Sequence, residues 1–434
     1  MSVKRNEHPS KGQLGNSPGG FSLDLKYTQE EGVIYLTGIQ SLVRLALDQH
    51  RADRRRGLRT AIFVSGYPGS PLAGLDLELN RQKRILEEHD TLFIPGLNEE
   101  LAATAVFGSQ MMHSLPRPKY DGVVGMWFGK NPGVDRSGDA LRHANFRGVG
   151  KNGGVLALTG DDSRPRSSTL STDANTTFYD FFMPVIYPGN VQEVLDLGIH
   201  GFMLSRASGL WVGMKILSEV ADSAGTAEVS PDRIAPVVPS TELDGRLFEP
   251  QLHLNTFIPE ILDVERGLYL ARLELAKQYA RENGINRIVL PTSDAWLGIV
   301  AAGKTYFDVR QALSELGLDD AALERYGIRI LKMGMLFPVE PHIIREFARG
   351  LEEILVIEDK RPFLESFVKE ILYNASERPT VVGKMDEQGR EFLPMHGGLD
   401  VDLVARAIAS RLRRKASIES VDRRIRELDA PRPV

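Results

Sequence analysis

The 434-residue chain contains no cysteine, which excludes disulfides, thiolate metal sites and iron–sulfur clusters held by its own residues. Its net charge is −5, so the composition indicates no overall basic surface for nucleic acid. No apolar run reaches the length of a membrane span, and residues 1–20 lack the apolar core of a secretory signal. We therefore expect a cytoplasmic protein that engages neither nucleic acid nor a membrane.

The pattern that is present is typical of a layered α/β protein. Short apolar runs alternate with amphipathic stretches, and 434 residues exceed one compact core, so two or three domains are expected. The strands expected in a first unit are 60–66, 91–94, 122–129, 154–160 and 183–188. Those expected in a second unit are 287–290, 297–303, 328–334, 352–359 and 380–385. Between the units, proline-rich residues 228–259 indicate a linker, and a helix is expected over 264–283.

Three segments outside these units are interpreted from composition. The basic run 50–59 could contact nucleic acid, but most of its arginines lie at the end of an expected helix, where cations suit the helix dipole. Residues 1–20 are expected to be a flexible lead-in, and residues 413–434 look like an exposed basic tail.

Three polar stretches follow expected strands of the first unit, where ligands of α/β sheets bind. Residues 64–76 (VSGYPGSPLAGLD) match neither a dinucleotide fingerprint nor a phosphate loop, and the turn could be a plain connection in which Ser70 caps a helix. Residues 129–145 and 159–175 could surround an anionic ligand or be solvated loops. The polar side chains of the former are Lys130, Asn131, Asp135, Arg136, Asp139 and His143. Because the three strands share one sheet, all three stretches should meet at one edge.

Residues 96–110 (GLNEELAATAVFGSQ) place two carboxylates, Glu99 and Glu100, before a run of small and apolar side chains. Acidic side chains in the first turn of a helix interact favourably with the positive end of the helix dipole, and this alone could explain why two glutamates stand there. The small residues that follow predict a helix packed closely on several sides. Its first turn should then lie at an interface rather than in water.

These motifs together resemble the thiamine-diphosphate-dependent 2-oxoacid:ferredoxin oxidoreductases, most of all the long bacterial indolepyruvate:ferredoxin oxidoreductases. The motifs, in order, are GYPGSP, NEELAATAVFGSQ, GKNPGVDRSGD and HANFRG. The resemblance implies an α/β fold made of a pyrimidine-binding domain, with a mostly parallel sheet and helices on both faces, and a transketolase C-terminal-like α/β domain. The implied boundaries are a flexible N-terminus 1–20, the pyrimidine-binding domain 21–240, a linker and connecting helix 241–284, the second domain 285–415 and a basic tail 416–434.

The resemblance also implies roles for individual residues. Glu99, not Glu100, would face N1′ of the aminopyrimidine, where a shared proton favours the imino tautomer that deprotonates the thiazolium C2. Ser70 would direct its hydroxyl toward the substrate carboxylate. The remaining residues expected to line the cofactor pocket are Tyr67, Pro68, Gly69, Lys130, Asn131 and Arg136.

Several parts that the family reaction requires are missing from the sequence. There is no G-D-G…N motif for Mg²⁺ and the diphosphate, no cysteine for [4Fe–4S] clusters and no small domain for coenzyme A. The chain is thus expected to be one subunit or a fragment, part of an oligomer and inactive without a pyrophosphate-binding and iron–sulfur partner. The complete enzyme would convert an aryl 2-oxoacid to an acyl-CoA and reduce ferredoxin. The alternatives are a non-catalytic scaffold with the same fold and a component of a non-oxidative 2-oxoacid decarboxylase.

Overall fold

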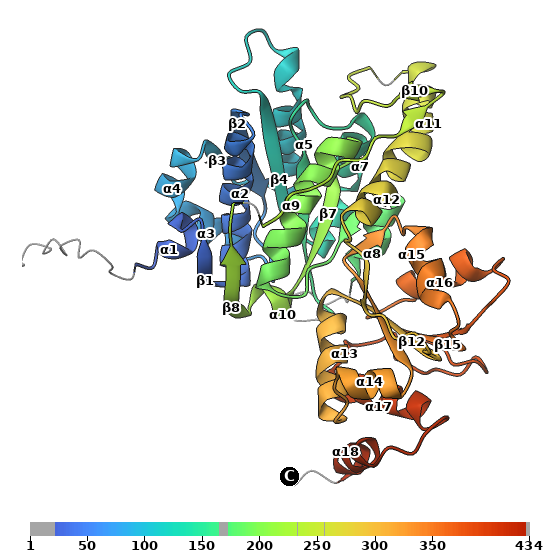
Figure 1. The fold of residues 1–434 in the computed structure, drawn as a ribbon. Coiled ribbons are helices and arrows are strands. Elements are labelled where there is room, and N and C mark those ends of the chain that lie inside the picture. The colour runs from blue at the N-terminus through green and yellow to red at the C-terminus, as the bar shows by residue number, and fades with distance from the viewer. Residues whose placement is uncertain (1–21, 165–171, 232, 256, 431–434) are drawn as a thin grey trace, which may run out of the picture.

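The computed structural model describes residues 22–164, 172–231, 233–255 and 257–430, so the expected lead-in 1–20 lies outside the described residues. Two larger sheets dominate, one of seven strands in the order β14-β6-β7-β5-β4-β2-β3 and one of five in the order β11-β13-β12-β15-β16. Figure 1 shows them as two layered units, the second below and to the right of the first. The predicted α/β class is confirmed.

The seven-stranded sheet is parallel except for one edge strand. Its parallel strands are β2 (Thr60–Gly66), β3 (Thr91–Phe93), β4 (Gly122–Lys130), β5 (Val155–Asp161), β6 (Val185–Ile186) and β7 (Val212–Leu217). The antiparallel edge strand β14 (Met335–Phe337) comes from the second half of the chain. The sequence patterns predicted five of these strands and missed β7, because its buried Lys215 interrupts the apolar run.

Helices cover both faces of this sheet, which explains why its strands read as continuous apolar runs. A Cβ on Gly201 of α9 (Val191–Ser208) would touch Leu156, whereas a Cβ on Gly125 would touch Val155 and Val106 of α5 (Glu99–Gln110). Neighbouring residues of a strand point to opposite faces, so α9 and α5 lie on opposite sides. The helix α2 (Gly38–Arg55) lies beside α9 in Figure 1. The remaining elements of this unit are α1 (Leu25–Thr28), α3 (Leu75–Arg81), α4 (Lys83–Glu88), η1 (Met111–Ser114), α6 (Asn131–Arg136), α7 (Gly138–Arg147), α8 (Ala174–Asp180), α10 (Ser218–Ala221), and the antiparallel pair β1 (Gly32–Thr37) and β8 (Ala224–Val229).

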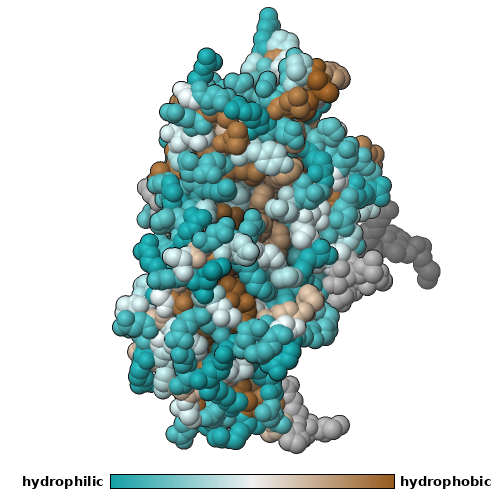
Figure 2. Space-filling model, turned by 90° about the vertical axis from the view of Figure 1, so that its right-hand side faces the viewer, coloured by the Kyte–Doolittle hydropathy of each residue, from teal (hydrophilic) through white to brown (hydrophobic). Residues whose placement is uncertain are grey.

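The connecting segment is largely irregular, as expected, and then forms an arm. The short hairpin of β9 (Glu242–Leu243) and β10 (Arg246–Leu247) precedes consecutive helical turns, α11 (Glu260–Gly267), η2 (Leu268–Arg272) and α12 (Leu273–Glu282). The helix predicted over 264–283 therefore exists and begins a turn earlier. Large apolar side chains are exposed on this arm, and Figure 2 shows apolar residues near the upper end of the molecule, at the level of α11. They include Leu247, Phe257, Ile258 and Leu262.

The second sheet is also buried on both faces. Its strands are β11 (Arg287–Leu290), β12 (Leu297–Ala302), β13 (Ile328–Met333), β15 (Glu353–Ile357) and β16 (Thr380–Val382), with β11 antiparallel. Its helices are α13 (Gly303–Glu315), α14 (Asp320–Arg325), α15 (Pro341–Ala348), α16 (Phe363–Leu372), α17 (Val401–Leu412) and α18 (Glu419–Asp429). Ile299 packs in a core with residues of α13 and α17, whereas the next residue, Val300, belongs to the core that continues into the first unit. The two units thus share one apolar core.

The expected basic tail is partly helical. Val421 and Ile425 of α18 are buried against the second unit, so the expectation of an exposed tail is wrong for these residues. Their spacing of four residues puts both on one face of the helix, and the surrounding arginines face outward. Among the residues that the structure describes, no helix is long and apolar enough to cross a lipid bilayer.

Candidate functional site

The three polar stretches predicted from sequence meet at one edge of the first sheet, as far as the structure describes them; residues 165–171 of the third stretch lie outside the described residues. β2, β4 and β5 are adjacent and parallel, and they end at Gly66, Lys130 and Asp161. A Cβ on Gly69 would lie 3.0 Å from the side chain of Lys130. A Cβ on Gly160 would lie 2.7 Å from Cδ of Pro71. The loop after β2 therefore crosses the ends of β4 and β5, which confirms the expected convergence.

Glu99 is the first residue of α5 and lies at this edge. The side chain of Asn98 caps the helix by accepting a hydrogen bond of 2.8 Å from the amide of Leu101. Only 8% of Glu99 is exposed to solvent, whereas Glu100 is exposed. The two adjacent acids are therefore in different environments. The expectation of a helix packed closely on several sides is wrong, because Leu101, Ala105 and Gly108 are exposed and α5 buries mainly the face of Ala102, Ala103 and Val106.

The surroundings of the Glu99 carboxylate are two glycines and an indole ring. A Cβ on Gly133 would lie 2.7 Å from Oε1 of Glu99, and a Cβ on Gly129 would lie 3.3 Å from its Cγ. The indole N–H of buried Trp127 donates a hydrogen bond of 2.9 Å to the main-chain oxygen of Glu99. Within the described parts of the chain, the carboxylate itself has no hydrogen-bond or ion-pair partner. Neither of its oxygens is among the fully buried polar atoms that lack a partner, so the carboxylate can be reached from outside the protein.

Residues 129–145 are not the polar loop that one interpretation expected. They form the end of β4 and two helices, α6 and α7. Asn131 is buried, and its amide nitrogen has no hydrogen-bond partner among the residues described. Lys130 is half-buried and forms no ion pair with any described residue. The edge thus combines a carboxylate, an ammonium group and an amide that are free to bind a ligand.

The other polar residues of this stretch face water. Asp135 and Arg136 are exposed at the end of α6. Asp139 and His143 form a surface pair on α7, with 3.6 Å between the ring nitrogen and the carboxylate. His143 is exposed, so it is not a structural histidine of the interior.

The turn after β2 forms the wall beside Lys130. Tyr67 and Pro68 are exposed, and Gly69 and Ser70 are half-buried. Ser70 does not cap a helix, because the next helix, α3, begins at Leu75. In the described part of the chain, its hydroxyl has no hydrogen-bond partner, so it is available to a ligand.

Sequence reasoning missed a second polar cluster at the same edge. Nζ of Lys215, on β7, lies 3.5 Å from Oδ2 of Asp161 and 3.0 Å from Oδ1 of Asp173. Burial alone would lower the pKa of Lys215, but the carboxylates of Asp173 and Asp161 outweigh burial and raise it. Burial raises the pKa of Asp161. The sequence signal that could have revealed this cluster is Lys215, a lysine inside an apolar stretch. Burying its charge is costly unless acids neutralise it.

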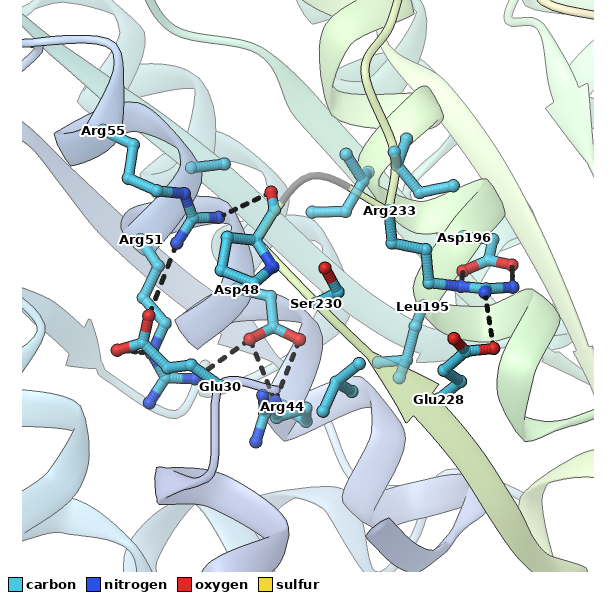
Figure 3. A pocket seen from close by; sticks show the side chains of 15 residues that line it. Glu30, Arg44, Asp48, Arg51, Arg55, Leu195, Asp196, Glu228, Ser230 and Arg233 are labelled. Atoms are coloured by element: carbon cyan, nitrogen blue, oxygen red, sulfur yellow. Dashed lines mark hydrogen bonds and ion pairs between the residues drawn. The ribbon is translucent and has the colours of Figure 1, made fainter. Parts of the chain in front are cut away.

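A separate small cavity of about 50 Å³ lies away from this edge, between α2, α9 and the segment after β8. Figure 3 shows its arginines held by neighbouring acids and main-chain oxygens. Arg44 and Arg51 bind Asp48, and Arg233 binds Asp196 and Glu228. Because each of these cations is already paired, the contacts around the cavity hold the segment of residues 228–231 and 233–234 in place, and the cavity is not an anion site.

Large apolar side chains surround the first turn of α5 on the surface. Leu97 is 86% exposed, the largest exposed fraction among the large apolar residues described. The others near it in sequence or on adjacent strand ends are Tyr67, Leu92, Ile94 and Leu101. No group of three or more potential metal ligands occurs among the described residues.

Comparisons with known proteins agree with this arrangement. The fold resembles that of a 2-oxoglutarate:ferredoxin oxidoreductase from Magnetococcus marinus, with a TM-score of 0.62 and 13% identity over 88% of this chain and 66% of that one. Residues 287–433 match the family model described as an indolepyruvate oxidoreductase domain.

Curated relatives carry the name indolepyruvate oxidoreductase subunit IorA. Those of Methanothermobacter marburgensis and Methanothermobacter thermautotrophicus are each 26% identical, covering 84% and 94% of this chain. That of Pyrococcus abyssi is 24% identical over 92% of this chain. Over most of its length the chain is thus similar to indolepyruvate oxidoreductase subunits, in agreement with the resemblance of its motifs. It spans 54%, 58% and 56% of the length of these three relatives.

Proposed function

We propose that this chain supplies the aminopyrimidine side of a thiamine diphosphate site in an enzyme that oxidatively decarboxylates an aryl 2-oxoacid of the indolepyruvate type. The observation that carries the proposal is Glu99, a buried carboxylate with no partner among the described residues, at the ligand-binding edge of a parallel sheet. A non-catalytic scaffold would have no need of an unpartnered carboxylate at this place. The similarity of the chain to indolepyruvate oxidoreductase subunits supports the same reaction.

Glu99 would hold a proton at N1′ of the aminopyrimidine. Its carboxyl group lies in the first turn of α5, beside Gly129 and Gly133, and has no partner among the described residues, so it is available to share a proton with the aminopyrimidine. Bound thiamine diphosphate supplies a carbon nucleophile for the 2-oxo carbon, which allows carbon dioxide to leave. Glu100, exposed beside it, takes no part.

Ser70 and Lys130 would orient the substrate. The Ser70 hydroxyl can donate to the carboxylate of the 2-oxoacid, and the Lys130 ammonium, beside Gly69, adds a positive charge to the same wall. Tyr67 and Pro68 would cover the apolar part of the substrate, and Asn131 would donate its free amide N–H to the cofactor or substrate. Arg136 is exposed and would reach a ligand only at the mouth of the site.

The other half of the site would come from a partner chain or further segment. The sequence has no cysteine, so [4Fe–4S] clusters must be held elsewhere, and we assign Mg²⁺ and the diphosphate to the same partner. This partner would bury the exposed apolar side chains near Glu99, including Leu97 and Leu101. Ferredoxin would accept the electrons, and coenzyme A would accept the acyl group.

Calorimetry with thiamine diphosphate and Mg²⁺ tests this division of the site. The chain alone should bind no tighter than about millimolar, a free energy of about −4 kcal/mol, because most cofactor charge lies on the diphosphate. Adding the cysteine-bearing partner should give tight binding, thermal stabilisation and 2-oxoacid-dependent dye reduction. Micromolar binding and dye reduction by the chain alone would contradict the proposal.

A further inference from the structure

We propose that Gly133 is a positioning residue that aims the Glu99 carboxylate, an inference that rests on the function proposed above. A Cβ on Gly133 would lie 2.6 Å from Cγ, 2.7 Å from Oε1 and 3.0 Å from Cδ of Glu99. These are the three nearest atoms to that Cβ, and all belong to one side chain. The end of the Glu99 side chain therefore fills the space that a Cβ at position 133 would need.

The main chain of Gly133 does not require glycine. The residue lies inside α6 and is not among the glycines with a positive φ, so any residue could adopt its backbone. Glycine inside a helix is unfavourable relative to alanine because it loses more conformational freedom on folding. The space needed by Glu99 is the remaining reason for glycine at this position.

Other neighbours of Glu99 confine it without binding its carboxylate. Trp127 holds the main-chain oxygen of Glu99 through its indole N–H at 2.9 Å. The ring of Trp127 in turn fits only because Gly129 has no side chain: a Cβ there would lie 2.9 Å from Cη2 of the ring. The start of α5 is thus fixed by a hydrogen bond, whereas the direction of the carboxylate is set by the shape left at Gly129 and Gly133.

The test compares Gly133→Ala with Gly108→Ala in the full chain. Gly108 is a helical glycine of α5 whose Cβ would meet no atom within 4 Å, so it is a matched control for adding one methyl group to a helix. Both variants should fold with unchanged or higher thermal stability. In a crystal structure of Gly133→Ala, the Glu99 side chain should occupy a different rotamer, whereas Gly108→Ala should leave it in place. A Glu99 side chain that stays in place in Gly133→Ala would overturn the inference.

The functional consequence is measured in the complex assembled with the partner. Displacing a reacting group by about 1 Å can cost roughly 100-fold in rate, so exchange of the C2 proton of thiamine diphosphate should slow by about that factor in Gly133→Ala. KM for the 2-oxoacid should change little, because Glu99 faces the cofactor rather than the substrate. Gly108→Ala should exchange at the parent rate. A displaced Glu99 with parent-like exchange would show that its direction is unimportant and would also overturn the inference.

Glu99→Gln, measured in parallel, separates this inference from the proposed function. Parent-like exchange in Glu99→Gln means that the proposed function is wrong, whatever Gly133→Ala does. Slow exchange in Glu99→Gln together with an undisturbed Gly133→Ala means that the function stands and the positioning role of Gly133 does not.

Discussion

Arg206 and Asp53 form a bidentate ion pair inside the first unit, with both N–O distances 2.8 Å. Asp53 is completely buried on α2, and Arg206 reaches it from α9. Asp53 also accepts a hydrogen bond from Thr60 at the start of β2, and Arg206 donates to the main-chain oxygen of Gly153, before β5. The pair therefore joins both helices on one face of the sheet to the strands beneath them.

Removing the charge of Asp53 should be strongly destabilising. Asp53→Asn keeps the size of the side chain but leaves Arg206 without its counter-ion, and breaking a buried pair in this way costs about 3–5 kcal/mol. Glu88→Gln is the control, since it breaks an exposed pair with Arg84 and should change the free energy of unfolding by less than about 1 kcal/mol. Urea denaturation of both variants measures the difference, and equal stabilities would refute the structural role of Asp53.

His200 should make the free energy of unfolding depend on pH in the acid range. Burial between α9 and α12, where the ring meets the Tyr279 hydroxyl at 3.2 Å, lowers its pKa to about 4. As the pH falls through 6.5, the His200 imidazole takes up a proton in the unfolded chain but not in the folded chain. The free energy of unfolding therefore has its full value above pH 6.5 and falls as the pH drops toward 4. From these values, the loss between pH 7.5 and pH 5 is about 2 kcal/mol.

His200→Gln should remove that part of the pH dependence. Urea denaturation is measured at pH 7.5 and at pH 5 for both proteins. The drop in the free energy of unfolding between the two pH values should be about 2 kcal/mol smaller in the variant than in the parent. His143→Gln, at an exposed histidine of α7, should keep the parent's dependence. The same change with pH in all three proteins would mean that His200 is not buried in its neutral form.

Ser70→Ala should impair use of the 2-oxoacid in the assembled enzyme. Losing a hydrogen bond to a charged group should lower kcat/KM by about 1–3 kcal/mol. Affinity for thiamine diphosphate should change little, because the proposed partner of the Ser70 hydroxyl is the carboxylate of the substrate rather than the cofactor. Steady-state kinetics and calorimetry distinguish the two effects, and equal losses in both would show that the turn is only structural.

The strands of both sheets could be predicted because burial on both faces makes them apolar throughout. The exceptions have physical causes. β7 was missed because Lys215 interrupts it, and β14 because its three residues join a sheet built from the other half of the chain. The helices α6 and α7 were not separated from a polar loop, since a proline and glycines lie near their starts and their sequences are rich in polar residues.

The candidate site was only partly readable from sequence. The meeting of three strand ends followed from the parallel order, whereas the burial of Glu99 depends on the packing of α5 against Gly129, Gly133 and Trp127. The free amide of Asn131 and the neutralised Lys215 could not be anticipated, because they depend on contacts between segments distant in the chain. The steric relation between Glu99 and Gly133 is likewise visible only once α5 and α6 are packed together. The assignment of Glu99 to the cofactor stays a prediction.

The most direct test of the account is deuterium exchange at C2 of thiamine diphosphate in the assembled complex, compared between Glu99→Gln and Glu100→Gln. Both variants replace one carboxylate of α5 by an amide, but only Glu99 is buried at the edge of the sheet. Glu99→Gln should fold, assemble and slow the exchange by about 100-fold or more, the scale of a lost proton-transfer role, while Glu100→Gln should stay near the parent rate. Exchange in Glu99→Gln as fast as in the parent would contradict the central claim that this carboxylate activates the cofactor.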